Sequence, residues 1–122
     1  MTDPKTSILR WAPAVFLMGV IFVFSSIPSS ALPNFDWADL LVKKGSHALG
    51  YGLLAGSFWY GLAMSKDKVR LAWVLAAGYA LSDEFHQVFT PGRNATLWDV
   101  VIDSIGAALA LMLLSALRRQ ER

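Results

Sequence analysis

The chain has 122 residues, which is enough for a single domain. Hydrophobic residues make up 55% of it and charged residues 16%, against roughly 45–50% and 25% in soluble proteins. The formal net charge is +2, but Lys and Arg lie in short clusters between apolar segments, so membrane topology explains them better than nucleic-acid binding. The absence of Cys excludes disulfides, thiolate nucleophiles and cysteine metal sites.

Four apolar segments approach the roughly 20 residues that a membrane-spanning helix needs. They cover about 8–27, 46–64, 69–89 and 97–117. The connections after the second and third segments are short, which predicts that neighbouring helices run antiparallel. The sequence therefore predicts one all-α integral membrane domain over residues 1–122, built as a four-transmembrane-helix bundle.

The first segment also has features of a secretory signal peptide. Lys5 and Arg10 precede an apolar run, and the small residues Ser29, Ser30 and Ala31 follow it. The uncharged stretch 11–27 is longer than the usual apolar core of about 7–15 residues. Because three further spans follow, we expect a retained helix, with cleavage as the alternative.

The distribution of Lys and Arg predicts the orientation of the bundle. Eight of these residues lie before or at the start of the first segment, between the second and third, or after the fourth, and three lie on the opposite side. The side richer in Lys and Arg is cytoplasmic in membrane proteins. Both termini are therefore predicted to be cytoplasmic, and the connections 28–44 and 90–96 are predicted to face outward.

Small residues recur at helical spacing in three of the segments. Gly52 and Gly56 form a GxxxG pattern, three alanines line a stripe of the third segment, and Gly106 and Ala110 share a face of the fourth. Small residues let helix backbones approach closely in lipid. We expect ordinary packing within the chain, and a homodimer through these faces is the alternative.

Polar residues of the second and third helices fall at the predicted outward end. Lys44, His47 and Tyr51 are spaced by three and four residues, which puts them on one face of the second helix. Glu84 and Gln87 are three residues apart where the third helix leaves the membrane. Ionisable groups this close to hydrocarbon are costly, so they indicate a functional site.

The fourth helix and the loop before it add to the same end. Asp99 and Asp103 are four residues apart on one face, and Asp103 lies about 9 Å along the helix from Leu97. Arg93 follows a Pro-Gly turn that can direct it back over the site, where its guanidinium could grip phosphate or carboxylate. The sequence therefore predicts a site to which three helices and one loop contribute.

Simpler explanations exist for several of these residues. Lys44 can be a helix-end lysine with its charge in the interface, and Asp99 can be a first-turn carboxylate favoured by the helix dipole. Asp83 and His86 are not assigned to the site, because Asp83 lies about 100° around the helix from Glu84. A structural network of salt bridges is the alternative that would explain Glu84 and Asp103.

Several short motifs follow one another between residues 44 and 106. The motifs are Lys44-x-x-His47-x-x-x-Tyr51, Glu84-x-x-Gln87, Pro91-x-Arg93, Asp99 and Gly106. Their order, spacing and helix placement resemble the VanZ-like family of small bacterial membrane proteins. Two positions depart from the family pattern, because Lys43 stands where the family usually has Asp, and Asp103 where it usually has Asn.

The resemblance implies a multi-pass protein of the bacterial cell (inner) membrane with a role in the cell envelope. The family's name-giving member is linked to resistance to teicoplanin, a lipoglycopeptide antibiotic. The resemblance supplies a context and a site but no established reaction.

We consider three functions. The first is binding of an anionic lipid or lipid-linked envelope precursor, with cations holding phosphate and with Gln87 and Tyr51 adding hydrogen bonds. The second is an enzyme that hydrolyses such a lipid or transfers a group on it, with Glu84 as base and His47 as acid. The third is a structural or transport role, of which a channel is disfavoured because the inner halves of the helices are almost wholly apolar.

No cofactor or resident metal site is predicted from the sequence. Within the enzymatic alternative, a divalent metal held by the carboxylates of Glu84, Asp99 and Asp103 is conceivable, since hard cations prefer oxygen ligands.

Overall fold

The computed structural model describes residues 4–26, 39–89 and 97–120. The described residues are helices and turns, with no strand among them. The elements are α1 (Pro4–Leu9), α2 (Ala12–Ser25), α3 (Asp39–Gly61), the 3₁₀ helix η3 (Lys66–Lys68), α4 (Val69–Gln87) and α5 (Leu97–Gln120). The predicted all-helical architecture is therefore confirmed, with α1 and α2 together taking the place of the first predicted helix.

The first predicted span, over residues 8–27, is divided between two helices. The chain turns at Arg10 and Trp11, between α1 and α2. Pro13 lies in the first turn of α2, a position where its missing N–H costs nothing. Farther inside a continuous helix, the proline ring would clash with the carbonyl of Leu9, so the sequence ends one helix and begins another.

The other helix boundaries differ from the predicted ones by a few residues. Helix α3 begins at Asp39, well before the predicted Ser46, because charged residues can continue a helix beyond its apolar part. It ends at Gly61, since Ala63 and Met64 have φ of 64° and 55°, and the Met64 N–H donates to the Trp59 carbonyl at 2.8 Å. Apolarity therefore located the centres of the helices better than their ends.

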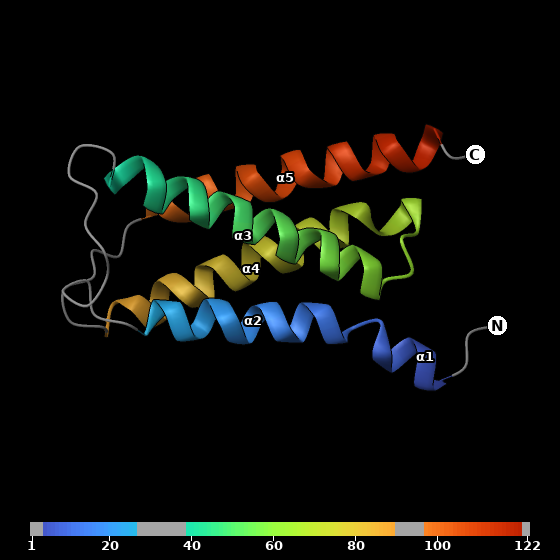
Figure 1. Ribbon diagram of the computed structural model, residues 1–122, viewed down its shortest axis with the longest axis horizontal. Coiled ribbons are helices and arrows are strands. Elements are labelled where there is room, and N and C mark those ends of the chain that lie inside the picture. Colours follow the sequence, from blue (N-terminus) through green and yellow to red (C-terminus); the bar gives the residue numbers. More distant parts are fainter. Residues whose placement is uncertain (1–3, 27–38, 90–96, 121–122) are drawn as a thin grey trace.

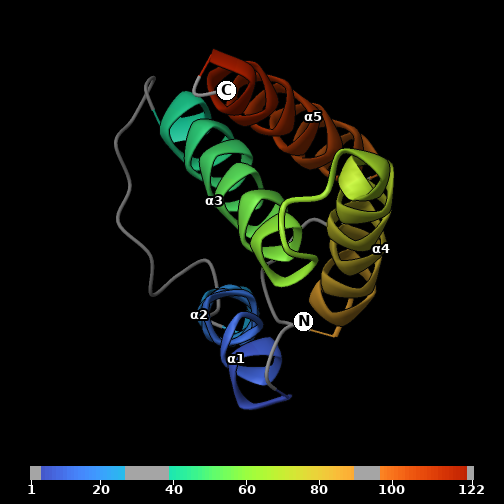
Figure 2. The ribbon, with the colours of Figure 1, turned by 90° about the vertical axis from the view of Figure 1, so that its right-hand side faces the viewer.

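The helices form an up-and-down bundle. Helices α3 and α5 run in the same direction, and α2 and α4 run in the opposite one, so the start of α1 and the end of α5 lie at the same end (Figure 1). Seen end-on, α3, α4 and α5 form a triangle, and α2 lies beside α3 and α4 (Figure 2). The antiparallel arrangement predicted for α3–α4 and α4–α5 is confirmed.

The tightest approach in the bundle joins α3 and α5. A Cβ added at Gly106 would lie 2.5 Å from the Ala48 carbonyl oxygen, and one at Gly52 would lie 3.1 Å from the Ala110 Cβ. A Cβ at Gly56 would lie 2.9 Å from the Leu114 Cδ1. The predicted use of these small residues for packing within the chain is therefore confirmed.

Helix α4 presents its own small residues to the interior of the bundle. The alanines of its stripe, Ala72, Ala76 and Ala80, are all buried. They form part of a core that also contains the large side chains of Trp59 and Leu54. The stripe therefore sets the close distance of α4 from the rest of the bundle.

Helix α2 is attached to the bundle by specific contacts. The Tyr79 hydroxyl of α4 donates to the Met18 carbonyl at 2.6 Å. Near the start of α2, the Arg10 guanidinium lies 5.5 Å from the ring centroid of Tyr60, within cation–π range, and the Trp11 ring packs against Gly61. These contacts fix where α2 lies along α3 and α4.

Much of the outer surface is apolar. The segments Lys5–Phe24 and Leu97–Arg119 are long and apolar enough to cross a membrane, and few of their residues are buried inside the bundle. Large apolar side chains such as Phe16, Leu109 and Met112 point outward, as expected of a surface in contact with lipid rather than water. The four-span topology and the cytoplasmic position of both termini remain predictions.

The contact of Gly106 with Ala48 leads to a testable prediction for stability. Gly106→Ala should lower the free energy of unfolding in detergent by about 1–3 kcal/mol, because its methyl group overlaps the backbone of α3. Gly78→Ala is the matched control, because a Cβ there meets nothing within 4 Å. Thermal unfolding of both purified variants checks this, and equal midpoints would contradict the tight α3–α5 contact.

Candidate functional site

Buried polar side chains of α3, α4 and α5 lie toward the end of the bundle at which α4 ends and α5 begins. This is the left end of the ribbon in Figure 1. Tyr51 of α3 is 1% exposed, Asp83 and Gln87 of α4 are 5% and 4% exposed, and Asp103 of α5 is 3% exposed. The structure therefore brings residues from three helices to one end, as the sequence indicates. Their role in binding a ligand remains a prediction.

Asp83 accepts hydrogen bonds from two of these residues. The Tyr51 hydroxyl donates to its Oδ2 at 3.2 Å, and the Gln87 amide nitrogen donates to the same oxygen at 3.3 Å. The other oxygen, Oδ1, is buried without a hydrogen-bond partner in the described part of the chain. A buried polar atom left in this state costs about 1–3 kcal/mol, so Asp83 can accept a further donor.

Asp83 is not among the site residues predicted from the sequence. The angle of about 100° from Glu84 is correct, but both residues are buried because α4 packs against α3 and α5 at once. The buried alanine stripe contains the missed signal. Extending it beyond Ala80 by three, four and seven residues reaches Asp83, Glu84 and Gln87, all of which are buried.

His47 and Asp103 form a second polar contact, between α3 and α5. The His47 Nδ1 lies 3.7 Å from the Asp103 Oδ1, a distance that suits an ion pair when His47 is protonated but is too long for a hydrogen bond. The His47 side chain is 33% exposed, whereas that of Asp103 is 4% exposed. This pair therefore connects the buried carboxylate to the surface.

The two contacts are joined through Tyr51. Its ring stacks with that of His47, with centroids 6.4 Å apart and an interplanar angle of 21°. Asp83, Tyr51, His47 and Asp103 thus form a continuous row across α4, α3 and α5, and we call these four residues the polar array. Only His47 in the array can carry a positive charge, so the array mainly offers acceptors to a ligand.

The other predicted site residues lie around the array or outside the described residues. Glu84 is buried on α4, and Asp99 is half-buried near the start of α5. Lys44 lies in the first part of α3, and Arg93 falls outside the described residues. The cationic part of the predicted site therefore remains a prediction.

The described residues do not form a metal site. Nowhere in the ranges 4–26, 39–89 and 97–120 do three or more His, Asp or Glu side chains lie close enough together to hold one ion. Glu84, Asp99 and Asp103 are thus not gathered into the three-carboxylate arrangement considered above.

His86 serves a different contact from the array. Its Nε2 lies 2.9 Å from the Ser26 hydroxyl, and its ring stacks on Phe22 with centroids 4.4 Å apart. It therefore connects the end of α4 to the end of α2.

A helical bundle with an apolar surface and a buried polar array at one end defines a small helical membrane protein. The model of the VanZ/LLP1 family matches residues 10–118, and the chain belongs to this family. The resemblance drawn from residues 44–106 is thus confirmed and extends over most of the chain. No individually curated protein and no solved structure gives a significant match.

The hydrogen bond between Tyr51 and Asp83 leads to a second prediction. Tyr51→Phe should lower the free energy of unfolding by about 1–3 kcal/mol, because it removes a donor from a buried carboxylate. In an Asp83→Asn background the same change should cost less, with a coupling energy of about 0.5–3 kcal/mol in a double-mutant cycle.

Tyr60→Phe is the control for this cycle, since the Tyr60 ring is exposed and lies under Arg10. It keeps the ring in place and should leave stability nearly unchanged. Strict additivity of the Tyr51 and Asp83 changes would show that the two side chains do not interact.

Proposed function

We propose that the protein binds the polar headgroup of an anionic lipid, or of a lipid-linked precursor of the cell envelope, at the polar array. The observation that supports this most strongly is the Asp83 carboxylate, which is buried and has one oxygen that receives no hydrogen bond from the described residues. A hydroxyl, amide or ammonium group of a ligand would satisfy that oxygen. Charge-assisted hydrogen bonds of this kind are stronger than neutral ones.

The predicted cations extend the same proposal to phosphate. His47 lies at the exposed edge of the array, and Lys44 is one helical turn before it on α3. Together with Arg93 they would hold a phosphate, while Asp83 and Asp103 would accept hydrogen bonds from hydroxyl or amide groups. A headgroup with both phosphate and hydrogen-bond donors fits this division better than a simple phosphate does.

The family and the charge distribution support a cellular setting for this function. We place the protein in the bacterial inner membrane as a multi-pass protein with both termini in the cytoplasm, so the array faces outward. Binding of an envelope precursor on that side would contribute to glycopeptide resistance of the teicoplanin type. The family membership and the apolar outer surface support this setting.

An enzyme acting on the same lipid is the second candidate. The Asp103 carboxylate at 3.7 Å from His47 Nδ1 favours it, because a nearby carboxylate can pair with an imidazole that accepts a proton. Glu84 as a second proton-transferring group is part of this candidate. Incubation of the purified protein with radiolabelled polyprenyl monophosphate, with and without a chelator, tests it, and absence of turnover in both arms would exclude it for that substrate.

The binding proposal predicts a specific effect of Asp83→Asn. Native mass spectrometry should show phosphatidylglycerol, whose headgroup carries a phosphate and hydroxyl groups, bound to the wild type in preference to phosphatidylcholine. The variant should bind phosphatidylglycerol at least about tenfold more weakly, equivalent to about 1.4 kcal/mol, because an amide nitrogen replaces one acceptor oxygen for the headgroup hydroxyls. Cells that depend on the protein for teicoplanin resistance should lose that resistance with the same change.

Asp67→Asn is the matched control, since it removes an exposed carboxylate from η3 at the opposite end of the bundle. It should bind like the wild type. Equal affinity of Asp83→Asn and wild type would refute a role of the array in binding.

A further inference from the structure

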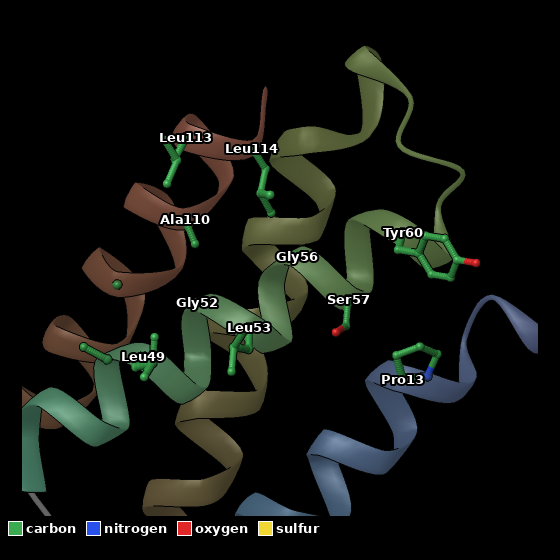
Figure 3. Close-up of a pocket in the computed structure, with 12 residues that line it drawn as sticks. Pro13, Leu49, Gly52, Leu53, Gly56, Ser57, Tyr60, Ala110, Leu113 and Leu114 are labelled. Atoms are coloured by element: carbon green, nitrogen blue, oxygen red, sulfur yellow. The ribbon is translucent and has the colours of Figure 1, made fainter. Parts of the chain in front are cut away.

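An apolar groove runs along the outside of the bundle between α3 and α5. It has a volume of about 470 Å³. Leu49 and Leu53 rise from α3, Leu113 and Leu114 come from α5, and Pro13 of α2 lies near one end (Figure 3). Ser57 and the Tyr60 hydroxyl are its polar side-chain groups, so an apolar occupant fits most of its length.

The floor of the groove consists of glycines that α5 already uses. A side chain at Gly52 or Gly56 would collide with Ala110 or Leu114 of the same chain. Helix α5 already packs closely against these glycines. A helix from a second copy of the protein could therefore not approach them as closely as small residues usually allow. The exposed side chains of Leu49, Leu53 and Leu113 stand as walls on both sides. This shape suits a narrow, flexible chain better than a helix.

One end of the groove adjoins the polar array. Its lining begins with Ala48, which follows His47 in the sequence, and with Gly106, which lies one helical turn after Asp103. Along α3 it continues to Tyr60, a distance of about 18 Å at 1.5 Å per residue. This length is close to half of the roughly 30 Å hydrocarbon core of a bilayer. The length of the groove therefore suits one extended hydrocarbon chain of a lipid.

We propose that this groove holds one hydrocarbon chain of the same amphiphile whose headgroup lies at the polar array. The inference rests on the proposed function and extends it to the hydrocarbon tail of the ligand. The polar array would bind the headgroup, and the adjoining groove would bind the tail. The head of the ligand lies near Ala48, and its tail points toward Tyr60 and Pro13.

Photo-crosslinking of the whole protein in bilayers tests the inference. Two phosphatidylglycerol probes are used, one with a diazirine near the carbonyl of an acyl chain and one with it near the terminal methyl group. The first should label the groove at Leu49, and the second should label it near Tyr60 and Leu113. Each probe should label its own groove residues at least about fivefold more than it labels Val74, an exposed apolar residue of α4 outside the groove.

A groove-filling variant adds a second measurement. Ser57→Phe places a ring in the groove and should reduce labelling there at least about fivefold, whereas Val74→Phe should leave it unchanged. The wild-type labelling order needs no variant, so the inference stays testable even if Ser57→Phe does not fold. Equal labelling of Val74 and the groove residues, or the reverse order of the two probes, would overturn it.

Two further measurements distinguish a bound hydrocarbon chain from a second copy of the protein, and tail binding from headgroup preference. Because the chain has no Cys, a single Leu53→Cys variant reports on a second copy in the groove, and rapid disulfide dimers would overturn the inference. Matched phosphatidylcholine probes that label the groove equally, in the same order, would support the tail channel while contradicting the headgroup preference of the proposed function. Failure of one proposal is thus distinguishable from failure of the other.

Discussion

The close approach of α3 and α5 at Ala48 and Gly106 is the constraint on which the rest of the structure depends. With no side chain at Gly106, the backbone of α5 comes within contact distance of α3 just beside His47. The Asp103 carboxylate, one turn earlier on α5, consequently lies next to the imidazole. The same approach determines the floor of the groove, so one missing Cβ positions both the polar and the apolar parts of the candidate site.

The second determinant is the placement of carboxylates in a mostly apolar bundle. In lipid, a buried acidic group must find donors, cations or a proton, because water is not available to solvate it. Tyr51 and Gln87 supply two donors to Asp83, but both bonds reach the same oxygen. A purely structural role would be served better by a fully satisfied carboxylate or by an apolar residue. Among the described residues Asp83 is thus only partly satisfied, and this is the observation behind the proposed binding role.

The helices could be predicted from the sequence because apolar runs of about 20 residues have few structural alternatives in lipid. Their ends could not, since helix formation continues through the charged start of α3 at Asp39, where apolarity has already stopped. The break before α2 depends on the steric effect of Pro13, which a count of apolar residues does not register.

The candidate site shows a similar division. Helical spacing was sufficient to place His47 and Tyr51 on one face and to bring Asp103 to the same end of the bundle. It was not sufficient for Asp83, because a helix packed on two sides buries two adjacent residues that point in different directions. The signal for Asp83 lay instead in the alanine stripe of α4, whose continuation beyond Ala80 reaches it.

The residues of helix α2 divide into a few that anchor it to the bundle and many that face lipid. Lipid tails are as apolar as the helix surface, so burying α2 against the bundle gains little from its apolar residues. Its place depends instead on contacts such as Tyr79 with Met18 and Ser26 with His86. The outward side chains of α2 can then exchange among apolar types with little consequence. Sequence variation in relatives should therefore be tolerated widely on that face and very little at the few residues that anchor it.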